Sequence, residues 1–447
     1  MNIIAVDCGA SFIKAALIKN GEIVSQDQRK SPVVHLDEDI TNPIQINALV
    51  SLVGDIIKNL GTNEQEITLC ISNEMHGFLL SKADTTPVTD YISWQKEYGN
   101  IEVNGTRAID ILNQKDLSED IFHTGMKTRA GLPSCNLLYL IKSGIFKAND
   151  DEKIYFFTLG DYILFALSGK IPPCHPTNAA ATGLYDILKG KWNHKIISSI
   201  NADKIIFPHI GEGRIDFKYA GIVIHAHCAI GDQQAALLGA GLRDTDSLSF
   251  NLGTGAQVSR LISKPVFSNS CQIRPYFYGQ YIKTIPHLPS GRAINVYIRF
   301  IKDLLENFGL FYTDDKVWIV LLQSLENVSE NRLFCDLSFF ENAVTDHATG
   351  RIEHIEEYSF TVGNLMDSVV RTLSENFLWA ATLICDDCNT PPQKIIFSGG
   401  IAKKIDKVRQ NILSNYKESI VHIAENETLI GLYLYAAGKE YKNDKSI

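Results

Sequence analysis

The segment Ile4-Ala5-Val6-Asp7-Cys8-Gly9-Ala10-Ser11-Phe12-Ile13-Lys14 decides the fold, because it joins two apolar runs through one short polar turn. Apolar runs bounded by glycine and small polar residues are typical of strands, so the segment predicts a strand, a tight turn and a second strand. A tip of this composition can also present backbone N–H groups to phosphate oxygens. It therefore carries both a structural and a chemical expectation.

The residues that follow predict a β-β-β-α-β unit. Asn20-Gly21 is a strong hairpin signal between the second and third strands. We expect Asn42 to cap the helix, Pro43 to lie in its first turn and Gly61 to end it. The predicted strands are Asn2–Val6, Phe12–Ile18, Glu22–Ser25 and Ile67–Ile71, and apolar residues at helical spacing run from Ile46 to Leu60.

A similar opening recurs in the second half of the chain. The turn Gly253-Thr254-Gly255 lies between predicted strands at Ser247–Leu252 and Gln257–Ile262. A helix through residues 365–378 and a strand at Lys394–Phe397 follow. The repeat predicts two α/β halves of similar plan, residues 1–245 and 246–447, with residues 85–215 as an insertion that elaborates the first half.

Composition excludes several classes of protein. The 447 residues suit two to three domains, and 45% hydrophobic with 21% charged residues excludes wholesale disorder. The net charge of -9 argues against a nucleic-acid surface. No apolar run has the roughly 18 residues of a membrane span. Nine scattered cysteines and a start unlike a signal peptide predict a cytoplasmic protein, with no membrane partner.

The interpretation of the turns at Gly9–Ser11 and Gly253–Gly255 depends on whether they face each other. A single tip is most simply an ordinary hairpin with a turn aspartate. Facing each other across a cleft, the two tips would form a phosphate clamp. Asp7 could then hold a hydrated Mg²⁺, and Lys14 adds a cation close by.

Two glycine-containing junctions carry further candidates. In Gly231-Asp232-Gln233-Gln234, Asp232 lies where a strand leads into a helix, so it is either an N-cap or a carboxylate that accepts a substrate proton. In Ser398-Gly399-Gly400, the paired glycines either form a plain tight turn or let a flat ligand such as adenine approach the backbone.

Two segments of the first half are candidates for contact with a small substrate. Glu74-Met75-His76-Gly77 ends a buried strand, where open α/β sheets place ligand residues, although a Met-His pair is more often part of a core. Ser93-Trp94-Gln95 offers an aromatic face beside an amide, which suits a polyol and also suits ordinary packing.

Taken in order, these motifs resemble the FGGY family of carbohydrate kinases, which shares its fold with actin and the heat-shock chaperone ATPases. The resemblance runs nearly end to end. It implies an α/β protein of two actin-like (ribonuclease H-like) ATPase domains with an interdomain cleft, residues 1–245 binding sugar and 246–447 binding nucleotide. The segments that carry it are Ile4–Lys14, Asp161–Gly169, Ala181–Asp186, Gly231–Ala236, Asn251–Gln257, Ser398–Gly400 and Glu427–Gly431.

The resemblance also implies an ATP- and Mg²⁺-dependent kinase acting on a ketose. Asp232 would be the catalytic base and would contact the sugar, and Asp7 would hold the metal. The implied sugar contacts are Met75, His76, Trp94 and Gln95. The implied nucleotide contacts are Gly9, Ala10, Ser11, Lys14, Gly253, Thr254, Gly255, Gln257, Gly399 and Gly400.

The acceptor is the least determined part of this interpretation. Met75-His76-Gly77 resembles both xylulokinases and sedoheptulokinases, whereas Ile92–Gln95 and Gly291–Asn295 resemble the sedoheptulokinase branch. Sedoheptulose is therefore the expected acceptor, and a xylulokinase or another sugar or polyol kinase is the alternative. A non-catalytic sugar sensor and an ATP-dependent interaction protein on the same scaffold are more distant alternatives. A homodimer is one candidate assembly.

Overall fold

The first sheet begins with the strands at the start of the chain. The structure, a computed structural model, describes residues 2–33, 40–147, 152–253, 255–326, 328, 332–388, 391–417, 419–424 and 426–438. In it β1 (Asn2–Cys8), β2 (Phe12–Lys19) and β3 (Glu22–Lys30) form an antiparallel meander. Asn20 and Gly21 have φ of 52° and 89°, the left-handed conformation that a two-residue hairpin turn requires.

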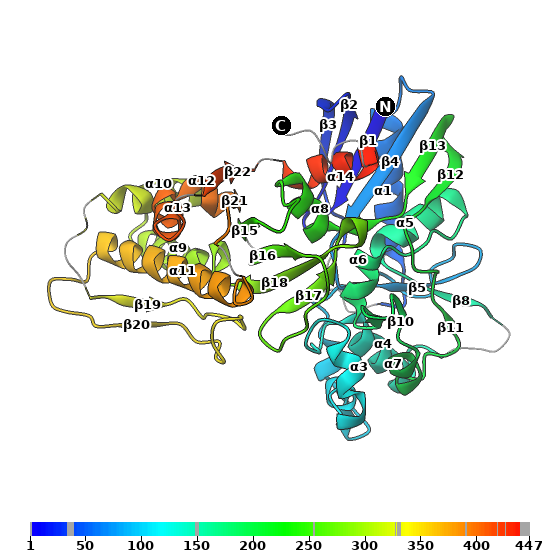
Figure 1. Ribbon diagram of the computed structural model, residues 1–447, viewed down its shortest axis with the longest axis horizontal. Helices are drawn as coiled ribbons and strands as arrows, with labels where there is room; N and C mark the ends of the chain where they lie inside the picture. The colour runs from blue at the N-terminus through cyan, green and yellow to red at the C-terminus, as the bar shows by residue number, and fades with distance from the viewer. Residues whose placement is uncertain are drawn as a thin grey trace.

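Parallel strands complete this sheet on the other side of β1. Next to β1 and parallel to it lies β4 (Glu66–Asn73), and both β13 (Ile222–His227) and the short β14 (Ile230–Gly231) run parallel to β4. At the edge, β12 (Arg214–Tyr219) pairs antiparallel with β13. The strand order is β12-β13-β4-β1-β2-β3, with β14 beside β4 (Figure 1).

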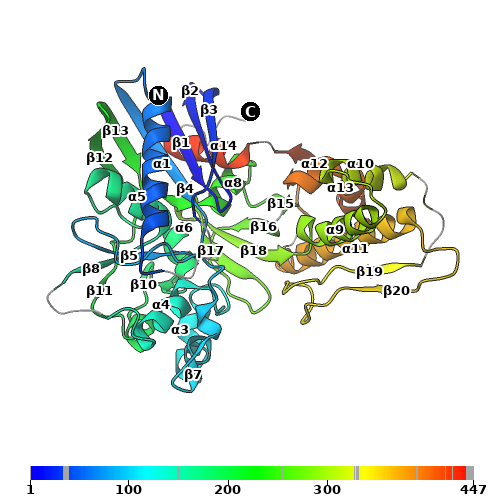
Figure 2. The same ribbon diagram turned by 180° about the vertical axis from the view of Figure 1, so that it is seen from behind.

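Helices cover both faces of the first sheet, because successive side chains of a strand point to opposite faces. Ile4 and Val6 of β1 pack with one pair of helices, and Ile3 and Ala5 pack with the other pair. The first pair is α1 (Ile44–Leu60) and α5 (Leu159–Ser168), and the second is α8 (Asp232–Gly239) and α14 (Glu427–Ala437). Figure 2 shows α1 in front of the sheet, and Figure 1 shows α8 and α14 on the opposite side.

The second sheet repeats the strand order of the first. Its strand order β18-β16-β15-β21-β22 matches β3-β2-β1-β4-β13 of the first sheet. The corresponding neighbours are parallel or antiparallel in the same way, and β17 is added at the edge. The predicted repeat is therefore present in the fold. The strands are β15 (Ser247–Asn251), β16 (Ala256–Ile262), β17 (Gln272–Pro275), β18 (Tyr281–Leu288), β21 (Lys394–Ser398) and β22 (Ile420–Ile423).

Helices of the second half enclose a core of their own with this sheet. In Figure 1 they lie at the left, away from the first sheet. They are α9 (Gly291–Asn307), α10 (Asp314–Ser324), α11 (Val362–Ile384), α12 (Gly400–Lys404) and α13 (Asp406–Leu413). The hairpin β19 (Phe334–Asp336) and β20 (Arg351–Glu353) lies beside them, and η4 (Phe277–Gly279) joins β17 to β18.

The insertion in the first half has its own core, built around the three-stranded sheet β11-β8-β5. Predicted helical segments near residues 136–145 and 161–167 correspond to α4 and α5. The sheet of this insertion begins with β5 (Leu79–Lys82), just before the predicted insertion of residues 85–215. The other elements are η1 (Tyr98–Asn100), β6 (Glu102–Val103), β7 (Thr106–Arg107), α2 (Ala108–Leu112), η2 (Lys115–Leu117), α3 (Ser118–Phe122), α4 (Pro133–Lys142), β8 (Ile154–Phe157), α6 (Pro176–Ala179), η3 (Ala180–Thr182), β9 (Tyr185–Asp186), β10 (Lys191–Trp192), α7 (His194–Ser199) and β11 (Ile205–Ile206).

Two details of the fold depart from local expectation. The predicted cap of α1 is wrong, because the helix begins after Pro43 and the carboxylate of Asp90 accepts the N–H groups of Gln45 and Ile46 at 3.2 and 2.9 Å. The last helix, α14, leaves the second half and packs against α8 and the first sheet. Among the described residues, no helix is long and apolar enough to cross a membrane.

Candidate active site

Three parallel strands end side by side and bring three carboxyl groups together. The register pairs Asp7 of β1 with Ser72 of β4, and Ile230 of β14 with the same Ser72. The chain continues from β4 into Glu74 and from β14 into Asp232. Because the carboxyl ends of parallel strands share one edge of a sheet, this edge is where α/β proteins place ligands.

Burial gives these acids unusual protonation behaviour. Burial raises the pKa of Asp7 to about 6, against the lowering effects of the Ser72 hydroxyl, which donates to Asp7 at 2.8 Å, and of Lys14. Burial, and then the charge of Asp7, raises the pKa of Asp232 to about 7. Burial, and then the charge of Asp232, raises the pKa of Glu74 to about 8. The repulsion among these acids favours a bound cation.

Asp232 is held at the first turn of α8. Its Oδ1 accepts the N–H of Gln233 at 2.7 Å. The preceding Gly231 donates its N–H to the Thr177 hydroxyl at 3.1 Å. A Cβ on Gly231 would lie 3.0 Å from the sulfur of Met75, so Met75 packs directly beneath the start of this helix. The carboxylate is thus fixed by both the strand that precedes it and the core below it.

In the second half, the turn at Gly253–Gly255 packs against the turn at Ser398–Gly400. The Gly253 N–H donates to Asn251 Oδ1 at 3.0 Å, which shapes the turn after β15. Gly399 has φ 88°, and a Cβ there would lie 2.6 Å from the Gly253 nitrogen. Gly255 and Gly400 have open space where a Cβ would lie. Thr254 lies outside the described residues.

In the first tip, Gly9, Ala10 and Ser11 form the turn between β1 and β2, and Lys14 is exposed on β2 opposite Asp7. Asp7 itself is half-buried at the base of this turn. A side-chain bond joins the two halves close to these tips. Gln233 of α8 donates to the Oε1 of Gln257 on β16 at 2.5 Å. Gln257, a predicted nucleotide contact, therefore also ties the halves together.

The predicted sugar contacts differ in their surroundings. Met75 is buried, and His76 has φ 66° and donates from Nδ1 to the Ala181 carbonyl at 2.7 Å. Trp94 is 41% exposed, and its hydrogen bonding lowers the pKa of the nearby Glu74 against the larger effect of burial. Gln95 is half-buried, with its backbone N–H bonded to the Ser93 hydroxyl at 3.3 Å.

This geometry can be compared with known proteins. Residues 2–246 match the N-terminal domain of the FGGY family of carbohydrate kinases. The chain belongs to this family. A glycerol kinase from Aquifex aeolicus is 26% identical to this FGGY chain over 280 residues, which are 59% of this chain and 55% of that protein. The chain thus spans about half the length of the curated relatives it matches.

Solved structures extend the likeness of this FGGY chain over its whole fold. A xylulose kinase from Lactobacillus acidophilus has a TM-score of 0.78 at 19% identity, covering 98% of this chain and 89% of that one. A gluconate kinase from the same organism has a TM-score of 0.79 at 19% identity, covering 99% and 90%. The predicted fold class, an α/β protein of two actin-like domains, is confirmed.

Several residues near the FGGY site were missed by sequence reasoning. Glu74 belongs to the segment Glu74–Gly77, of which only Met75 and His76 are predicted substrate contacts. Tyr91 packs against Gly77, where a Cβ would lie 2.0 Å from its hydroxyl oxygen. Arg129 and Arg274 approach His76 from two different halves of the chain. Arg274 left no local signal of its burial, because β17 alternates polar and apolar residues and an arginine is ordinary in such a strand.

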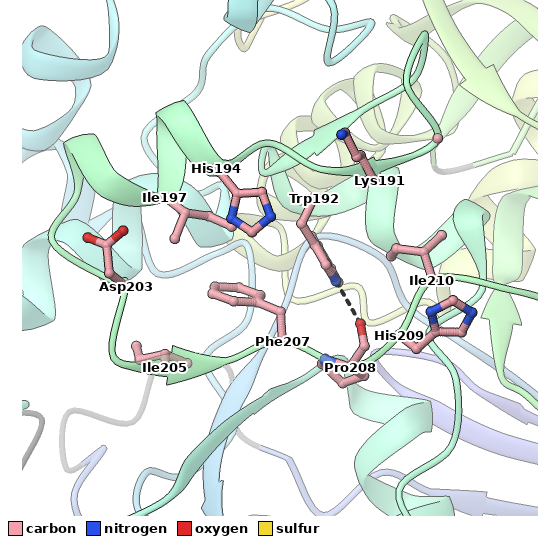
Figure 3. A pocket seen from close by; sticks show the side chains of 11 residues that line it. Lys191, Trp192, His194, Ile197, Asp203, Ile205, Phe207, Pro208, His209 and Ile210 are labelled. Carbon is pink, nitrogen blue, oxygen red and sulfur yellow. Dashed lines mark hydrogen bonds between the residues drawn. The ribbon is translucent and has the colours of Figure 1, made fainter. Parts of the chain in front are cut away.

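A cavity of about 390 Å³ lies elsewhere in the FGGY chain, within the insertion (Figure 3). Its wall includes Trp192, whose indole N–H donates to the Pro208 carbonyl at 2.7 Å. It contains none of the predicted site residues. The other lining residues are Gly190, Lys191, His194, Ile197, Asp203, Ile205, Phe207, His209 and Ile210.

Proposed function

We propose that this protein transfers the terminal phosphoryl group of ATP to a terminal hydroxyl of a sugar or polyol. One observation carries the proposal: Asp7 and Asp232 lie at the ends of β1 and β14, the strands on either side of the end of β4, and the matching turns of the two sheets carry glycine-rich tips. A carboxylate beside two such tips suits in-line phosphoryl transfer, which depends mainly on positioning and charge neutralisation. Membership of the FGGY family supports the same reaction.

The residues fit ATP and Mg²⁺ as cofactors. Half-buried, mutually repelling carboxyl groups at Asp7 and Asp232 form a suitable donor set for a hard divalent cation, and Asp7 is the proposed ligand. The open space at Gly255 and Gly400 leaves room for phosphates and adenosine beside the backbone. When bound, Mg·ATP supplies the phosphoryl group and neutralises its charge.

Asp232 is the proposed proton acceptor. Its fixed position at the start of α8 would orient the acceptor hydroxyl, and the carboxylate would take the hydroxyl proton as the new P–O bond forms. Gln233 and Gln257 would hold the two halves in register across the site. Closure of the halves would exclude water and so limit hydrolysis of ATP.

Among ketoses, the proposed acceptor is sedoheptulose, phosphorylated at its terminal hydroxyl, with xylulose as the alternative. The sedoheptulose proposal rests on the sequence resemblance at Ile92–Gln95 and Gly291–Asn295. The names of relatives broaden the panel to be tested, because they include glycerol, xylulose and gluconate kinases. Half-buried Gln95, or a neighbour such as Glu97, is proposed to bind the additional hydroxyls of the longer ketose, and exposed Trp94 is proposed to offer its aromatic face to C–H groups.

A coupled assay of ADP formation across ketoses, polyols and sugar acids tests the reaction. We expect ADP formation to rise strongly with one group of acceptors, and the Asp232→Asn variant to lose turnover by a factor on the order of 10² or more. A rate of ADP formation that no acceptor increases, but that unfolded peptide increases, would favour a chaperone-like ATPase instead. An Asp232→Asn variant with full turnover would remove Asp232 from the mechanism.

A second comparison tests the ketose. The Gln95→Ala variant should reduce kcat/KM for sedoheptulose more than for xylulose, by roughly tenfold, because a lost contact leaves a hydroxyl unpaired. Equal losses on both ketoses would show that Gln95 does not distinguish chain length.

A further inference from the structure

Two arginines from opposite halves of the chain approach the same imidazole. Arg129 lies between α3 and α4 in the first half, and Arg274 lies in β17 of the second half. Their Nη2 atoms are 3.4 and 3.5 Å from Nε2 of His76. Arg129 also donates to Nε2 of His287 at 2.6 Å, and Arg274 donates to the Gln272 amide oxygen at 2.7 Å.

None of these partners brings negative charge. The bond from His76 Nδ1 to the Ala181 carbonyl fixes the tautomer in which Nε2 is an acceptor. Burial, and then the two arginines, lowers the pKa of His76 well below its ordinary value. Burial, with the arginines, lowers the pKa of His287 to about 4. Both imidazoles are therefore neutral near pH 7, and the Gln272 amide is neutral as well.

Among the described residues neither guanidinium forms an ion pair, although the charge of Asp232 acts on Arg274 and the charges of Glu97 and Glu341 act on Arg129. Their positive charge is therefore only partly compensated, in a place where Arg129 is half-buried and Arg274 is buried. Arg274 is only 2% exposed. Its Nη1 and the Nε of Arg129 are buried without a hydrogen-bond partner anywhere in the described part of the chain. Burial, and then the charge of Arg129, lowers the pKa of Arg274 to about 9. A buried, unpaired cation is costly for a protein, so a site of this kind is suited to a ligand that supplies the missing charge.

We infer that Arg129 and Arg274 bind an oxyanion carried by the acceptor, so that the preferred acceptor is a polyhydroxylated acid rather than a neutral ketose. A guanidinium presents paired N–H donors that match the two oxygens of a carboxylate or the oxygens of a phosphate. The inference rests on the proposed phosphoryl transfer and changes only its acceptor.

The position of the pair relative to Asp232 supports an acceptor with two distinct ends. His76 follows Met75, and Met75 packs against Gly231, the residue before Asp232. The charge of Asp232 also acts on Arg274, raising its pKa against the larger effect of burial. An acceptor could therefore present a hydroxyl to Asp232 while its acid group lies at the arginines.

The nucleotide is the other source of an oxyanion, and the topology disfavours it. Arg274 lies on β17, the edge strand, whereas the two glycine tips of the second half follow β15 and β21. Two strands, β18 and β16, separate β17 from β15. Arg292, by contrast, begins α9 next to Gly291, where a Cβ would lie 3.7 Å from the Gly253 carbonyl oxygen. Arg292 thus lies on the nucleotide side and is not part of this proposal.

The test compares acids with neutral polyols of identical carbon skeleton. The pairs are D-gluconate with D-glucitol, D-galactonate with galactitol and D-xylonate with xylitol, with sedoheptulose and xylulose as neutral ketoses. We expect at least one acid to exceed its neutral partner, and both ketoses, by about tenfold or more in kcat/KM. Arg274→Gln should abolish most of that preference by raising KM for the acid, with KM for ATP unchanged. Arg299→Ala removes an exposed arginine of α9 and should change neither ratio.

Each contrary outcome has a distinct meaning. Turnover that favours neutral acceptors would overturn the inference and leave the proposed kinase reaction standing. An Arg274→Gln variant that raises KM for ATP and keeps the acid preference would assign the arginines to the nucleotide and also overturn it. If Arg274→Gln does not fold, Arg129→Gln, at a less buried position, replaces it. If no acceptor is turned over, the proposed function fails, and thermal shifts of the nucleotide-free protein decide the inference: a shift with an acid but not its alditol supports it, and none overturns it.

Discussion

At the scale of single residues, Asp232 combines two opposing influences. The start of a helix favours a negative charge, since backbone N–H groups and the helix dipole point toward it. Burial and the neighbouring Asp7 oppose that charge more strongly and raise the pKa of Asp232 to about 7. A general base is most effective when its pKa lies near the working pH, so this balance suits the proposed proton transfer.

The protonation of Asp232 should appear in the pH dependence of the reaction. Below about pH 7 the carboxyl is protonated and cannot accept a proton, so kcat/KM should fall as pH decreases, approaching tenfold per unit well below the pKa. Initial rates between pH 5 and 9 at saturating Mg·ATP measure this. A rate independent of pH across that range would contradict the assignment.

Asp7 should matter for the metal more than for the acceptor. Removing its carboxylate by Asp7→Ala takes away the proposed Mg²⁺ ligand, so the Mg²⁺ concentration needed for half-maximal turnover should rise by roughly tenfold or more. Acceptor binding, measured by calorimetry without nucleotide, should be nearly unchanged. Asp110→Ala, at an exposed acid paired with Arg107, is the control. We expect Mg²⁺ to bind mainly together with ATP, so tight Mg²⁺ binding at Asp7 of the nucleotide-free protein would contradict this proposal.

At the scale of elements, the start of α1 shows how a distant residue replaces a local one. The Asp90 carboxylate satisfies the N–H groups of Gln45 and Ile46, although Asp90 lies more than forty positions along the chain. It also accepts the N–H of Tyr91 at 2.8 Å. Asp90 thus joins α1 to the segment that leads toward Trp94.

The loss of this carboxylate should destabilise the protein measurably. Asp90→Ala leaves buried N–H groups unpaired and should lower the free energy of unfolding by about 1–2 kcal/mol. Asn42→Ala is the matched control and should have little effect, because α1 begins without a side-chain bond from its own N-cap region. Denaturant unfolding of both variants measures the difference. A larger loss of unfolding free energy from Asn42→Ala than from Asp90→Ala would show that Asn42 caps α1.

At the scale of the whole molecule, the end of the chain supports the helix that begins with Asp232. The last helix, α14, packs on α8 through glycines that let the backbones approach closely. A Cβ on Gly431 would lie 1.8 Å from the Ala235 carbonyl oxygen, and one on Gly239 would lie 1.8 Å from the Glu427 carbonyl oxygen. The second half therefore contributes to the position of a residue in the first.

Filling this contact should affect both stability and turnover. Gly431→Ala forces α14 and α8 apart, so we expect a loss of about 1–3 kcal/mol in the free energy of unfolding. Turnover should fall as well, because α8 carries Asp232. Thr428→Ala, on the same helix, is the control. Unchanged thermal unfolding of Gly431→Ala would show that the helices adjust without cost.

Sequence reasoning went furthest where the signal is local. The strand–turn–strand tips, the strand before Asp232 and the repeated β-β-β-α-β order can be predicted because periodicity, turn residues and apolar runs act within a few positions. The same local signals predicted Met75, His76 and the glycine tips as site residues. They left the acceptor open, since a substrate is selected by groups that converge from distant parts of a chain.

The sequence by itself determined the two-fold α/β plan, the FGGY resemblance and the position of Asp232 at a strand–helix junction. Only the tertiary structure decided that Asp90 caps α1, that α14 returns to the first half, and that Arg129 and Arg274 meet at His76. These two arginines lie 53 and 198 positions from His76 in the chain. Contacts over such separations depend on how the sheets and the insertion pack together, and no local pattern of residue types encodes that packing.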